Sequence, residues 1–240
     1  MATGGDNRDA MGTGAEKDRW EEKYRKEGRL WGEDPSVLAV ATIRFLERLP
    51  DRHTPRLLVD LGCGYGRDTV ALARGLPDDT FLGVDSSVSA VEAATRRCLE
   101  AGLSNVRIRC ADFRELHGER ADIVYCSNLY HLLRIPEREE FRSVVREVLN
   151  PGGFLFLSTL SARDPEHGGN GDPVPGDPGS FVFPGEDLWL HFATRKELSE
   201  TFGFLTIVSL SEIEYIERRV GGDHHHISWV LIGQRNGNGN

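Results

Sequence analysis

The stretch Val59–Ala73 reads VDLGCGYGRDTVALA and decides the fold of the chain. It places three glycines between a short apolar run and a helical pattern. Glycines at such a junction let the backbone turn sharply and approach a ligand closely, and the helix start offers unpaired N–H groups. Arg67 stands where a dinucleotide fingerprint requires Gly or Ala, and the Lys-Ser or Lys-Thr pair of a P-loop does not follow. The stretch therefore indicates a ligand-binding turn and disfavours both of those classes.

Short apolar runs alternate with helical patterns around this stretch. Unbroken apolar runs are typical of strands buried on both faces of a parallel sheet, and they lie at residues 56–61, 80–84, 106–110, 122–126, 154–157, 205–210 and 227–232. Helical patterns lie at residues 66–75, 87–101 and 137–149, and a capping box at Thr194 opens a further helix. Strands that alternate with helices over short connections predict a doubly wound α/β sheet.

The segments outside this core differ in composition. Residues 1–16 and 236–240 are small and polar and are predicted to be tails, which leaves residues 17–235 as a single domain. Residues 161–193 interrupt the alternation with a stretch rich in glycine and proline. Because long loops inside a compact domain are usually functional, we expect this segment to be an insertion that caps the substrate.

Two helices are expected in residues 17–50. The first carries Trp20 and Tyr24 four residues apart and hence on one face. The second is predicted to start at Asp34-Pro35, because aspartate caps helices and proline suits the first helical position.

Composition limits the class of protein. The chain has 240 residues, of which 39% are hydrophobic, and a formal net charge of −9, which fits one domain with a sizeable core. An acidic chain repels phosphate backbones and anionic lipid, so neither nucleic acid nor membrane is an expected partner. No apolar run approaches the ~18 residues of a membrane span. The four cysteines form no C-x-x-C pair, so we expect a cytoplasmic protein.

An acidic residue marks each of the first three predicted strands at its carboxyl end, namely Asp60, Asp85 and Asp112. An acid in the position of Asp85 can accept hydrogen bonds from both hydroxyls of a ribose. Asp112 and the following Phe113 can hold an adenine by amine contact and stacking. Asp85 or Asp112 alone can instead cap a helix. Three acids at successive strand ends, beside the glycines, favour a nucleoside site.

Residues 56–160 resemble the core of the class I S-adenosylmethionine-dependent methyltransferases. The likeness rests on the glycine stretch, on VDSS after the second strand, on Ala111-Asp112-Phe113 and on the strand NPGGFLFLS. It implies a Rossmann-like, seven-stranded, mostly parallel sheet whose last strand is antiparallel and lies beside the fifth. It also implies S-adenosylmethionine as cofactor, S-adenosylhomocysteine as product, and a cofactor site formed by Tyr24, Trp31, Asp60, Gly62, Cys63, Gly64, Asp85, Ser86, Asp112, Phe113, Ser127 and Asn128.

The resemblance assigns roles within that site. The methionine part is expected near the Gly62–Gly64 loop with its amino group oriented by Asp60, the ribose on Asp85, and the adenine near Asp112 and Phe113. The N-terminal aromatic residues and Trp31-Gly32 are similar to the lid of compact small-molecule methyltransferases of the tellurite-resistance and thiopurine type, in which such residues close over the cofactor. Aromatic faces tolerate a sulfonium and exclude water. For Tyr24 and Trp31, packing of the first helix on the core is the alternative.

Four histidines are candidates for orienting the acceptor or taking its proton, namely His131, His191, His224 and His226. His131 follows the fourth strand, where nucleic-acid amino-methyltransferases would carry an Asn/Asp-Pro-Pro-aromatic tetrad in place of Ser127-Asn128-Leu129-Tyr130. His224 and His226 precede the last predicted strand at the cofactor edge and would share one face, ~6.5–7 Å apart. A metal site and a solvated loop end are the alternatives for this pair. No metal-binding motif is present, and no metal is predicted.

The resemblance implies an enzyme that transfers a methyl group from S-adenosylmethionine to a small molecule. The accepting atom is a nucleophilic N, O or S, or a metalloid, and the reaction is an in-line displacement in a closed pocket. The alternatives are a regulatory protein that binds the nucleoside without methylating and, less favoured because of Arg67, a nicotinamide-dependent oxidoreductase. The expected partner is a small-molecule acceptor, and the chain is expected to be a monomer or a homodimer.

Overall fold

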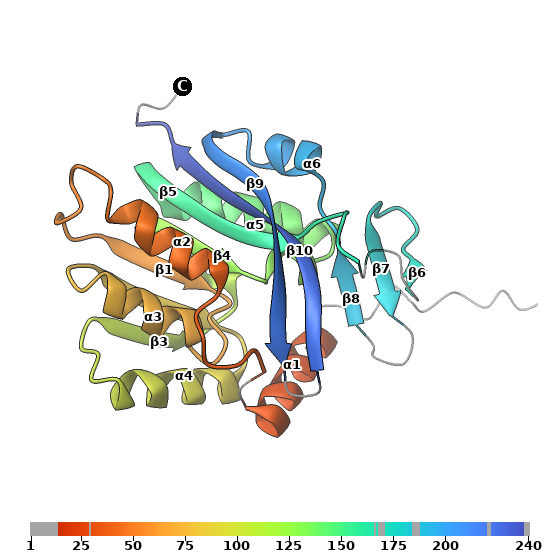
Figure 1. Cartoon of the computed structure of the whole chain (residues 1–240), viewed down its shortest axis with the longest axis horizontal. Coiled ribbons are helices and arrows are strands. Elements are labelled where there is room, and N and C mark those ends of the chain that lie inside the picture. Colours follow the sequence, from red (N-terminus) through yellow and green to blue (C-terminus); the bar gives the residue numbers. More distant parts are fainter. Residues whose placement is uncertain are drawn as a thin grey trace, which may run out of the picture.

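A seven-stranded sheet forms the centre of the computed structural model, which describes residues 14–28, 30–165, 167, 171–183, 188–219 and 222–237 (Figure 1). Its order is β3-β2-β1-β4-β5-β10-β9. The strands are β1 (Leu57–Leu61), β2 (Thr80–Asp85), β3 (Val106–Cys110), β4 (Ala121–Ser127), β5 (Leu149–Leu160), β9 (Leu205–Arg219) and β10 (Gly222–Arg235). The first five are parallel, and β10 is antiparallel to both β5 and β9. The predicted sheet, with an antiparallel last strand beside the fifth, is confirmed.

Helices cover both faces of this sheet, because successive strand residues point to opposite sides. In β4, Ile123 and Tyr125 join a core that includes the helical residues Leu38 and Leu72, and Val124 and Cys126 join the opposite core. Burial on both faces explains the unbroken apolar runs. The helices are α1 (Gly14–Glu27), α2 (Val37–Leu46), α3 (Arg67–Gly75), α4 (Val88–Glu100), α5 (Ile135–Val148) and α6 (Arg195–Thr201). None of the described helices is long and apolar enough to cross a membrane.

The N-terminal helices differ in detail from the prediction. The first, α1, begins at Gly14, three residues inside the predicted tail, and its Trp20 and Tyr24 rings lie 6.1 Å apart. The predicted start of α2 at Asp34-Pro35 is wrong. Ser36 caps the helix, because its Oγ accepts a hydrogen bond of 3.1 Å from the backbone N–H of Ala39. Residues 1–13 and 238–240 of the predicted tails lie outside the described residues.

The last two strands are much longer than predicted. Beyond the sheet, β9 and β10 continue as a paired ribbon down to the register pair of Arg219 and Gly222 (Figure 1). This ribbon has the polar sequence SEIEYIERR on one strand and GDHHH on the other, so it lacks the apolar run that marks a buried strand. The predicted position of the histidines before the last strand is therefore wrong, because His224 and His226 lie within β10.

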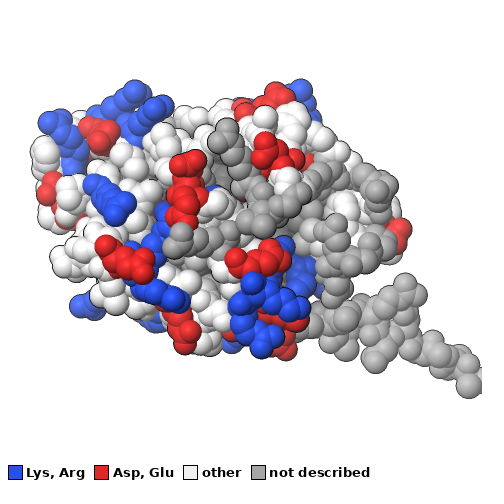
Figure 2. Space-filling view, turned by 60° about the horizontal axis from the view of Figure 1, so that its bottom comes forward, with Lys and Arg blue, Asp and Glu red and all other residues white. Residues whose placement is uncertain are grey.

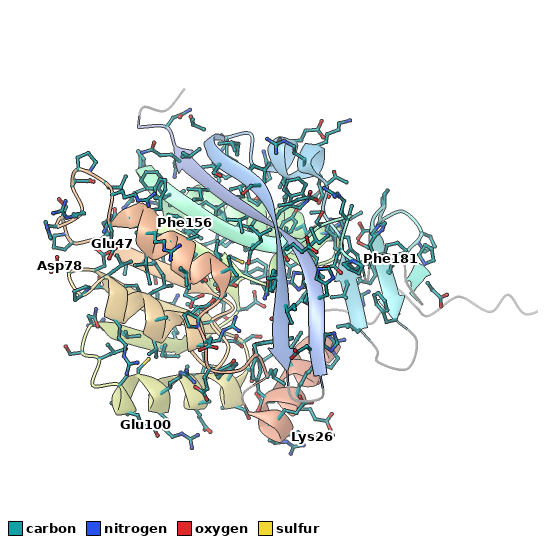
Figure 3. All side chains as sticks on the ribbon, viewed as in Figure 1. Lys26, Glu47, Asp78, Glu100, Phe156 and Phe181 are labelled. Atoms are coloured by element: carbon teal, nitrogen blue, oxygen red, sulfur yellow. The ribbon has the colours of Figure 1, made fainter. Side chains whose placement is uncertain are left out.

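The predicted insertion at residues 161–193 contains a small antiparallel sheet that the sequence did not suggest. Its strands are β6 (Asp172–Pro173), β7 (Ser180–Phe183) and β8 (Leu188–His191). Phe181 anchors this sheet on Phe192, with ring centroids 5.9 Å apart. Figure 3 places Phe181 on this outlying sheet and Phe156 in the central one. Residues 166, 168–170 and 184–187 of the insertion lie outside the described residues.

Candidate functional site

A cavity lies at the carboxyl ends of β1 to β4, where the parallel strands meet α1 and the loop after it. This is the edge at which α/β sheets bind their ligands. All of the residues predicted to bind the cofactor line this one cavity, namely Tyr24, Trp31, Asp60, Gly62, Cys63, Gly64, Asp85, Ser86, Asp112, Phe113, Ser127 and Asn128. The topology therefore brings together residues that are spread over a hundred positions of the chain. We call this space the first cavity.

The glycine loop fits closely around its neighbours. Gly64 has a φ of +54°, and a Cβ at this position would lie 2.7 Å from the hydroxyl of Tyr24. A side chain here would be strained by the backbone conformation and would displace Tyr24. The backbone N–H of Gly64 donates a hydrogen bond of 2.9 Å to Asp85. The loop is thus fixed between Tyr24 of α1 on one side and the end of β2 on the other.

Asp85 is held in place by the backbone. Its second oxygen accepts a hydrogen bond of 2.9 Å from the N–H of Ser87. Burial raises the pKa of Asp85, although the N–H groups of Ser87 and Gly64 act in the opposite direction. The helix-cap alternative for Asp85 is excluded, because the side chain of Ser87 caps α4. Each carboxylate oxygen keeps a further lone pair for a ligand hydroxyl.

Asp112 is the N-cap residue of a short 3₁₀ helix, Phe113–Leu116, so the capping alternative applies to it. It also forms a salt bridge of 2.7 Å with Arg114, a cavity residue that the sequence reasoning missed. Although burial acts the other way, the hydrogen bonds from Arg114 lower the pKa of Asp112. The ring of Phe113 packs edge-on against Phe141, with centroids 5.7 Å apart.

Asp60 is the most deeply buried acid of the first cavity, with 2% of its surface exposed. It accepts one hydrogen bond of 2.6 Å from the hydroxyl of Thr69. Burial raises the pKa of Asp60 to about 7, with the neighbouring Asp68 and Asp85 acting in the same direction. A cationic ligand group would favour the charged form, so the site suits a ligand with an ammonium.

Two sets of hydrogen bonds that the sequence did not predict hold α1 and the loop after it in place. On α1, the carboxylate of Glu21 accepts hydrogen bonds from the hydroxyls of Ser87 and Ser89, at 2.7 and 2.5 Å. These bonds lower the pKa of Glu21, and they place its charge at the amino end of α4, where an anion is stabilised. Glu21 stands directly after Trp20, but nothing in its sequence context indicates the partner.

The loop after α1 is fastened to the glycine stretch itself. The hydroxyl of Tyr65 accepts a hydrogen bond of 3.1 Å from the N–H of Trp31 and donates one of 2.7 Å to the carbonyl of Gly32. The guanidinium of Arg67 donates to the carbonyl of Trp31 at 2.7 Å. Tyr65, between the last two glycines, and Arg67, directly after them, were a signal that the prediction passed over. The ammonium of Lys23 lies 5.8 Å from the centre of the Trp31 ring.

A second cavity of about 440 Å³ adjoins the first. The two share Trp31, Arg67, Ser127 and Asn128. The second cavity continues between the loop before α2 and the β9–β10 ribbon, whose contributing residues are Ile213, Tyr215, Ile216, Glu217, Asp223 and Ser228. Asn128, at the junction, has a φ of +60°, which is uncommon for any residue with a side chain. Such strain is typical of functional sites.

None of the four predicted catalytic histidines lines either cavity. His131 is buried in a short 3₁₀ helix after β4. His191 lies between the hydroxyl of Ser180 and the carboxylate of Glu197, both at 2.8 Å. The described part of the insertion, which contains His191, contributes no residue to either cavity.

The histidine pair on β10 shares one face, as predicted. The rings of His224 and His226 stack with centroids 6.0 Å apart. His226 is 2% exposed, and its Nδ1 lies 3.1 Å from Asp164 while its Nε2 lies 3.7 Å from Glu217. Of these residues, Glu217 lines the second cavity. In the described residues, no group of three or more histidines, cysteines or acids is arranged to hold a metal ion.

Comparison with known proteins identifies the central region. Residues 58–153 match the family model described as a methyltransferase domain. The chain is 40% identical over 78 residues to a tRNA (guanine-N(7)-)-methyltransferase of Rubrobacter xylanophilus, which covers 30% of this chain and 35% of the relative. A solved structure from work on the conversion of a disulfide bond into a thioacetal group during echinomycin biosynthesis matches with a TM-score of 0.71 and 21% identity over 93% of each chain. TehB from Haemophilus influenzae matches with a TM-score of 0.63 and 16% identity over 92% of this chain and 67% of its own.

The matches to known proteins cover only part of the curated relatives. The chain spans between 35% and 47% of the length of the first curated relatives that it matches. The two solved structures share the fold across nearly all of this chain, but at low sequence identity. The similarity is thus strongest in the region that carries the glycine loop.

Proposed function

Residues 58–153 belong to the methyltransferase domains of the class I, S-adenosylmethionine-dependent type, and on this premise we propose that the protein methylates a small-molecule nucleophile. The observation that carries the proposal is the pair of adjoining cavities. The first has carboxylates where a nucleoside and an ammonium would need them, and the second offers space for an acceptor next to it. Methyl transfer requires both partners to be held in line.

The first cavity fits S-adenosylmethionine, the cofactor of this type of domain. Asp85 would hold the ribose hydroxyls, the buried Asp60 would hold the ammonium, and the backbone near Gly64 would admit the methionine part. Asp112 and Phe113 would border the adenine. When bound, S-adenosylmethionine supplies a methyl group that is electrophilic because its sulfur is positively charged.

The chain itself would align the reactants and exclude water. Tyr24 and Trp31 lie over the glycine loop, where their rings would shield the sulfonium from solvent. Tyr65 and Arg67 fix the lid loop, and their hydrogen bonds to it close the wall that the two cavities share. Approximation of this kind can contribute ~7–11 kcal/mol to the lowering of a reaction barrier.

Three observations support a small acceptor. The second cavity lies between the lid loop and the ribbon and is enclosed on those sides. The chain has a net charge of −9, and Figure 2 shows Lys and Arg side chains interspersed with Asp and Glu on the face that it presents. The tRNA-methylating relative resembles less than a third of this chain. The accepting atom is an N, O or S, or a metalloid.

The non-methylating alternative is less well supported. A regulatory protein would need no acceptor site, and the predicted insertion contributes nothing described to either cavity. However, the second cavity forms on the other side, from the β9–β10 ribbon, and it adjoins the cofactor site.

The test is release of S-adenosylhomocysteine from S-adenosylmethionine with panels of thiols, amines, phenols and metalloid anions. We expect turnover with one class, and strongly reduced turnover with Asp85→Ala at a cofactor concentration below the dissociation constant of this variant. Absence of S-adenosylmethionine binding in calorimetry would refute the proposal. Binding without turnover on any class would favour the regulatory alternative.

A further inference from the structure

We propose that Asp68 is a positioning residue, which holds one wall of the second cavity in line with the cofactor site. The inference rests on the proposed methyl transfer, and it adds a residue that acts through other residues and not on the reactants. Asp68 stands directly after Arg67 in the stretch that decides the fold, but nothing in its sequence context indicates its partners. Four observations carry the proposal.

The first observation is a continuous stretch of chain in the wall of the second cavity. Residues 31–38 run from the loop after α1 into the first turn of α2, and every one of them lines this cavity. We call this stretch the wall segment. Its first residue, Trp31, also lines the first cavity. The position of the wall segment relative to the glycine loop therefore sets the position of an acceptor relative to the donor methyl.

The second observation is that Asp68 binds the far end of the wall segment at two points. One carboxylate oxygen accepts a hydrogen bond of 2.8 Å from the backbone N–H of Ser36, and the other accepts one of 2.6 Å from the Ser36 hydroxyl. Hydrogen bonds to a carboxylate are stronger than those between neutral groups. Because Ser36 is also the N-cap of α2, the same contact fixes the place where that helix starts.

The third observation is that both ends of the wall segment are attached to the same part of the chain. At the near end, the N–H of Trp31 donates to the hydroxyl of Tyr65, and its carbonyl accepts from Arg67. At the far end, Ser36 is held by Asp68, the next residue after Arg67 and part of the first turn of α3. Without Asp68, the Ser36 end would lose both hydrogen bonds that join it to the glycine stretch.

The fourth observation is the burial of this cluster. Asp68 is 7% exposed, and Tyr125 on β4 is fully buried. The hydroxyl of Tyr125 donates a hydrogen bond of 2.7 Å to the oxygen of Asp68 that also binds the Ser36 hydroxyl. Burial raises the pKa of Tyr125 well above its ordinary value, and Asp68 acts in the same direction, so this hydroxyl remains a donor. Tyr125 lies two residues before Ser127, which lines both cavities.

The same hydrogen bonds argue against a direct contact between Asp68 and the cofactor, although Asp68 also lines the first cavity. A carboxylate has about four lone-pair sites. Two donors meet each oxygen of Asp68. They are the N–H of Ser36 and Nε of Arg67 on one oxygen, and the hydroxyls of Ser36 and Tyr125 on the other. Since protein donors fill these sites, Asp68 acts through Ser36.

The test compares Asp68→Ala with the wild type on the member of the panel of thiols, amines, phenols and metalloid anions that the wild type turns over fastest. A displacement of about 1 Å can lower the rate of an aligned reaction about 10²-fold, so we expect kcat to fall roughly 10- to 100-fold. The affinity for S-adenosylhomocysteine should stay within about threefold. Its calorimetric stoichiometry counts the folded sites, so kcat per site does not fall merely because part of the protein unfolds.

Asp79→Ala is the matched control. Asp79 is also buried and accepts a backbone N–H, from Arg56 at 3.0 Å, but it stands directly before β2 and lines neither cavity. Its loss should lower stability and leave kcat per site within about threefold. Ser36→Ala tests the same attachment if Asp68→Ala fails to fold. Its control is Thr194→Ala, which removes the cap of α6 and should leave kcat per site unchanged.

Amide hydrogen exchange in the S-adenosylhomocysteine complex gives a second readout, which requires no acceptor. The N–H of Ser36 and those of the first turn of α2 should exchange faster in Asp68→Ala, while those of α5 should not change. Wild-type exchange at these positions would overturn the inference. An equal loss of kcat per site in Asp79→Ala, or a large loss of S-adenosylhomocysteine affinity in Asp68→Ala, would also overturn it.

Failure of the proposed function can be told apart from failure of this inference. A wild type that turns over no member of the panel contradicts the proposed function, and the positioning role fails with it. Turnover by the wild type together with an unchanged kcat per site in Asp68→Ala refutes the positioning role alone.

Discussion

Replacing Asp60 by asparagine should have opposite effects on stability and on cofactor binding. Asp60 is 2% exposed, and burial raises its pKa from 3.8 to about 7. The charged form is therefore unfavourable in the folded protein without a ligand. Asparagine removes the charge and keeps an oxygen that can accept the hydrogen bond from Thr69.

The sign follows from proton linkage. Because the pKa is higher in the folded state, the folded protein holds a proton that the unfolded chain has lost, and stability falls as pH rises from about 4 to about 7. Each pH unit in that window corresponds to about 1.4 kcal/mol, so Asp60 costs up to about 4 kcal/mol at pH 8. Between pH 4 and pH 8, the free energy of unfolding of the variant should rise by up to this amount relative to that of the wild type. A buried amide N–H₂ adds a penalty of ~1–3 kcal/mol, which does not depend on pH.

Urea unfolding of the ligand-free protein at several pH values measures the difference. Asp79→Asn is the matched control, because Asp79 is equally buried but is paired with Arg56 at 3.0 Å. Its loss breaks a buried ion pair and should destabilise the protein at pH 8. A difference between Asp60→Asn and wild type that stays constant from pH 4 to pH 8 would refute the reasoning.

The same substitution should weaken cofactor binding if Asp60 holds the ammonium. We expect a loss of ~1.5–3 kcal/mol for S-adenosylhomocysteine, the range for a hydrogen bond to a charged group. Wild-type affinity should rise up to tenfold per unit between pH 5.5 and pH 7, because binding requires the carboxylate. Calorimetry in that range measures both. Unchanged affinity in the variant would remove Asp60 from this role.

Four further outcomes test the lid, the loop and the insertion. Asp85→Ala should weaken S-adenosylmethionine binding by ~1.5–3 kcal/mol in calorimetry on folded protein, and unchanged affinity would exclude a ribose contact. Gly64→Ala should lower cofactor affinity. Adding Tyr24→Phe to this variant should restore part of the affinity, because the Tyr24 hydroxyl is the atom 2.7 Å from the new Cβ. No recovery of affinity in the double variant would mean that backbone strain dominates. Glu21→Gln should speed amide hydrogen exchange across α1 and leave that of α5 unchanged, and equal exchange would show that these bonds do not hold the lid. Shortening residues 164–180 should leave cofactor affinity within about threefold, and a larger loss would contradict the separation seen here.

The fold of the central region could be predicted because its physics is local and repeated. The strand at Val106–Cys110 was predicted to the residue. The bounds of β1, β2 and β4 were predicted to within one residue at each end, because strands that are mostly buried on both faces read as apolar runs. The acids Asp60 and Asp85 could be placed at one edge, since parallel strands end on the same side of a sheet. Convergence of the cofactor residues on one cavity followed from that topology.

The acceptor side could not be predicted, because its geometry depends on long-range pairing. The outer part of β9 carries alternating charges that are typical of a surface segment, yet it pairs with β10 and forms a cavity wall. The sequence does not distinguish Glu217 from the other acids of β9, and only the structure shows that its side chain is buried. For the histidines, the sequence suggested a catalytic role that their positions in the structure do not support. The chemistry of His191 suggested a base, but Ser180 and Glu197 hold both of its nitrogens.

Unfavourable features are concentrated at the edge where the two cavities meet. Asp60 is buried with a raised pKa, Asn128 has a positive φ, and Glu217 stands at the end of a set of buried titratable groups. The buried charge of Asp60 costs stability in the protein without ligands, and a cation in the first cavity would compensate it. A fold selected only for stability would lack this buried charge, which Asp60→Asn is expected to remove. The position of Asp60 in the first cavity therefore argues that this edge is shaped by the binding of a positively charged group.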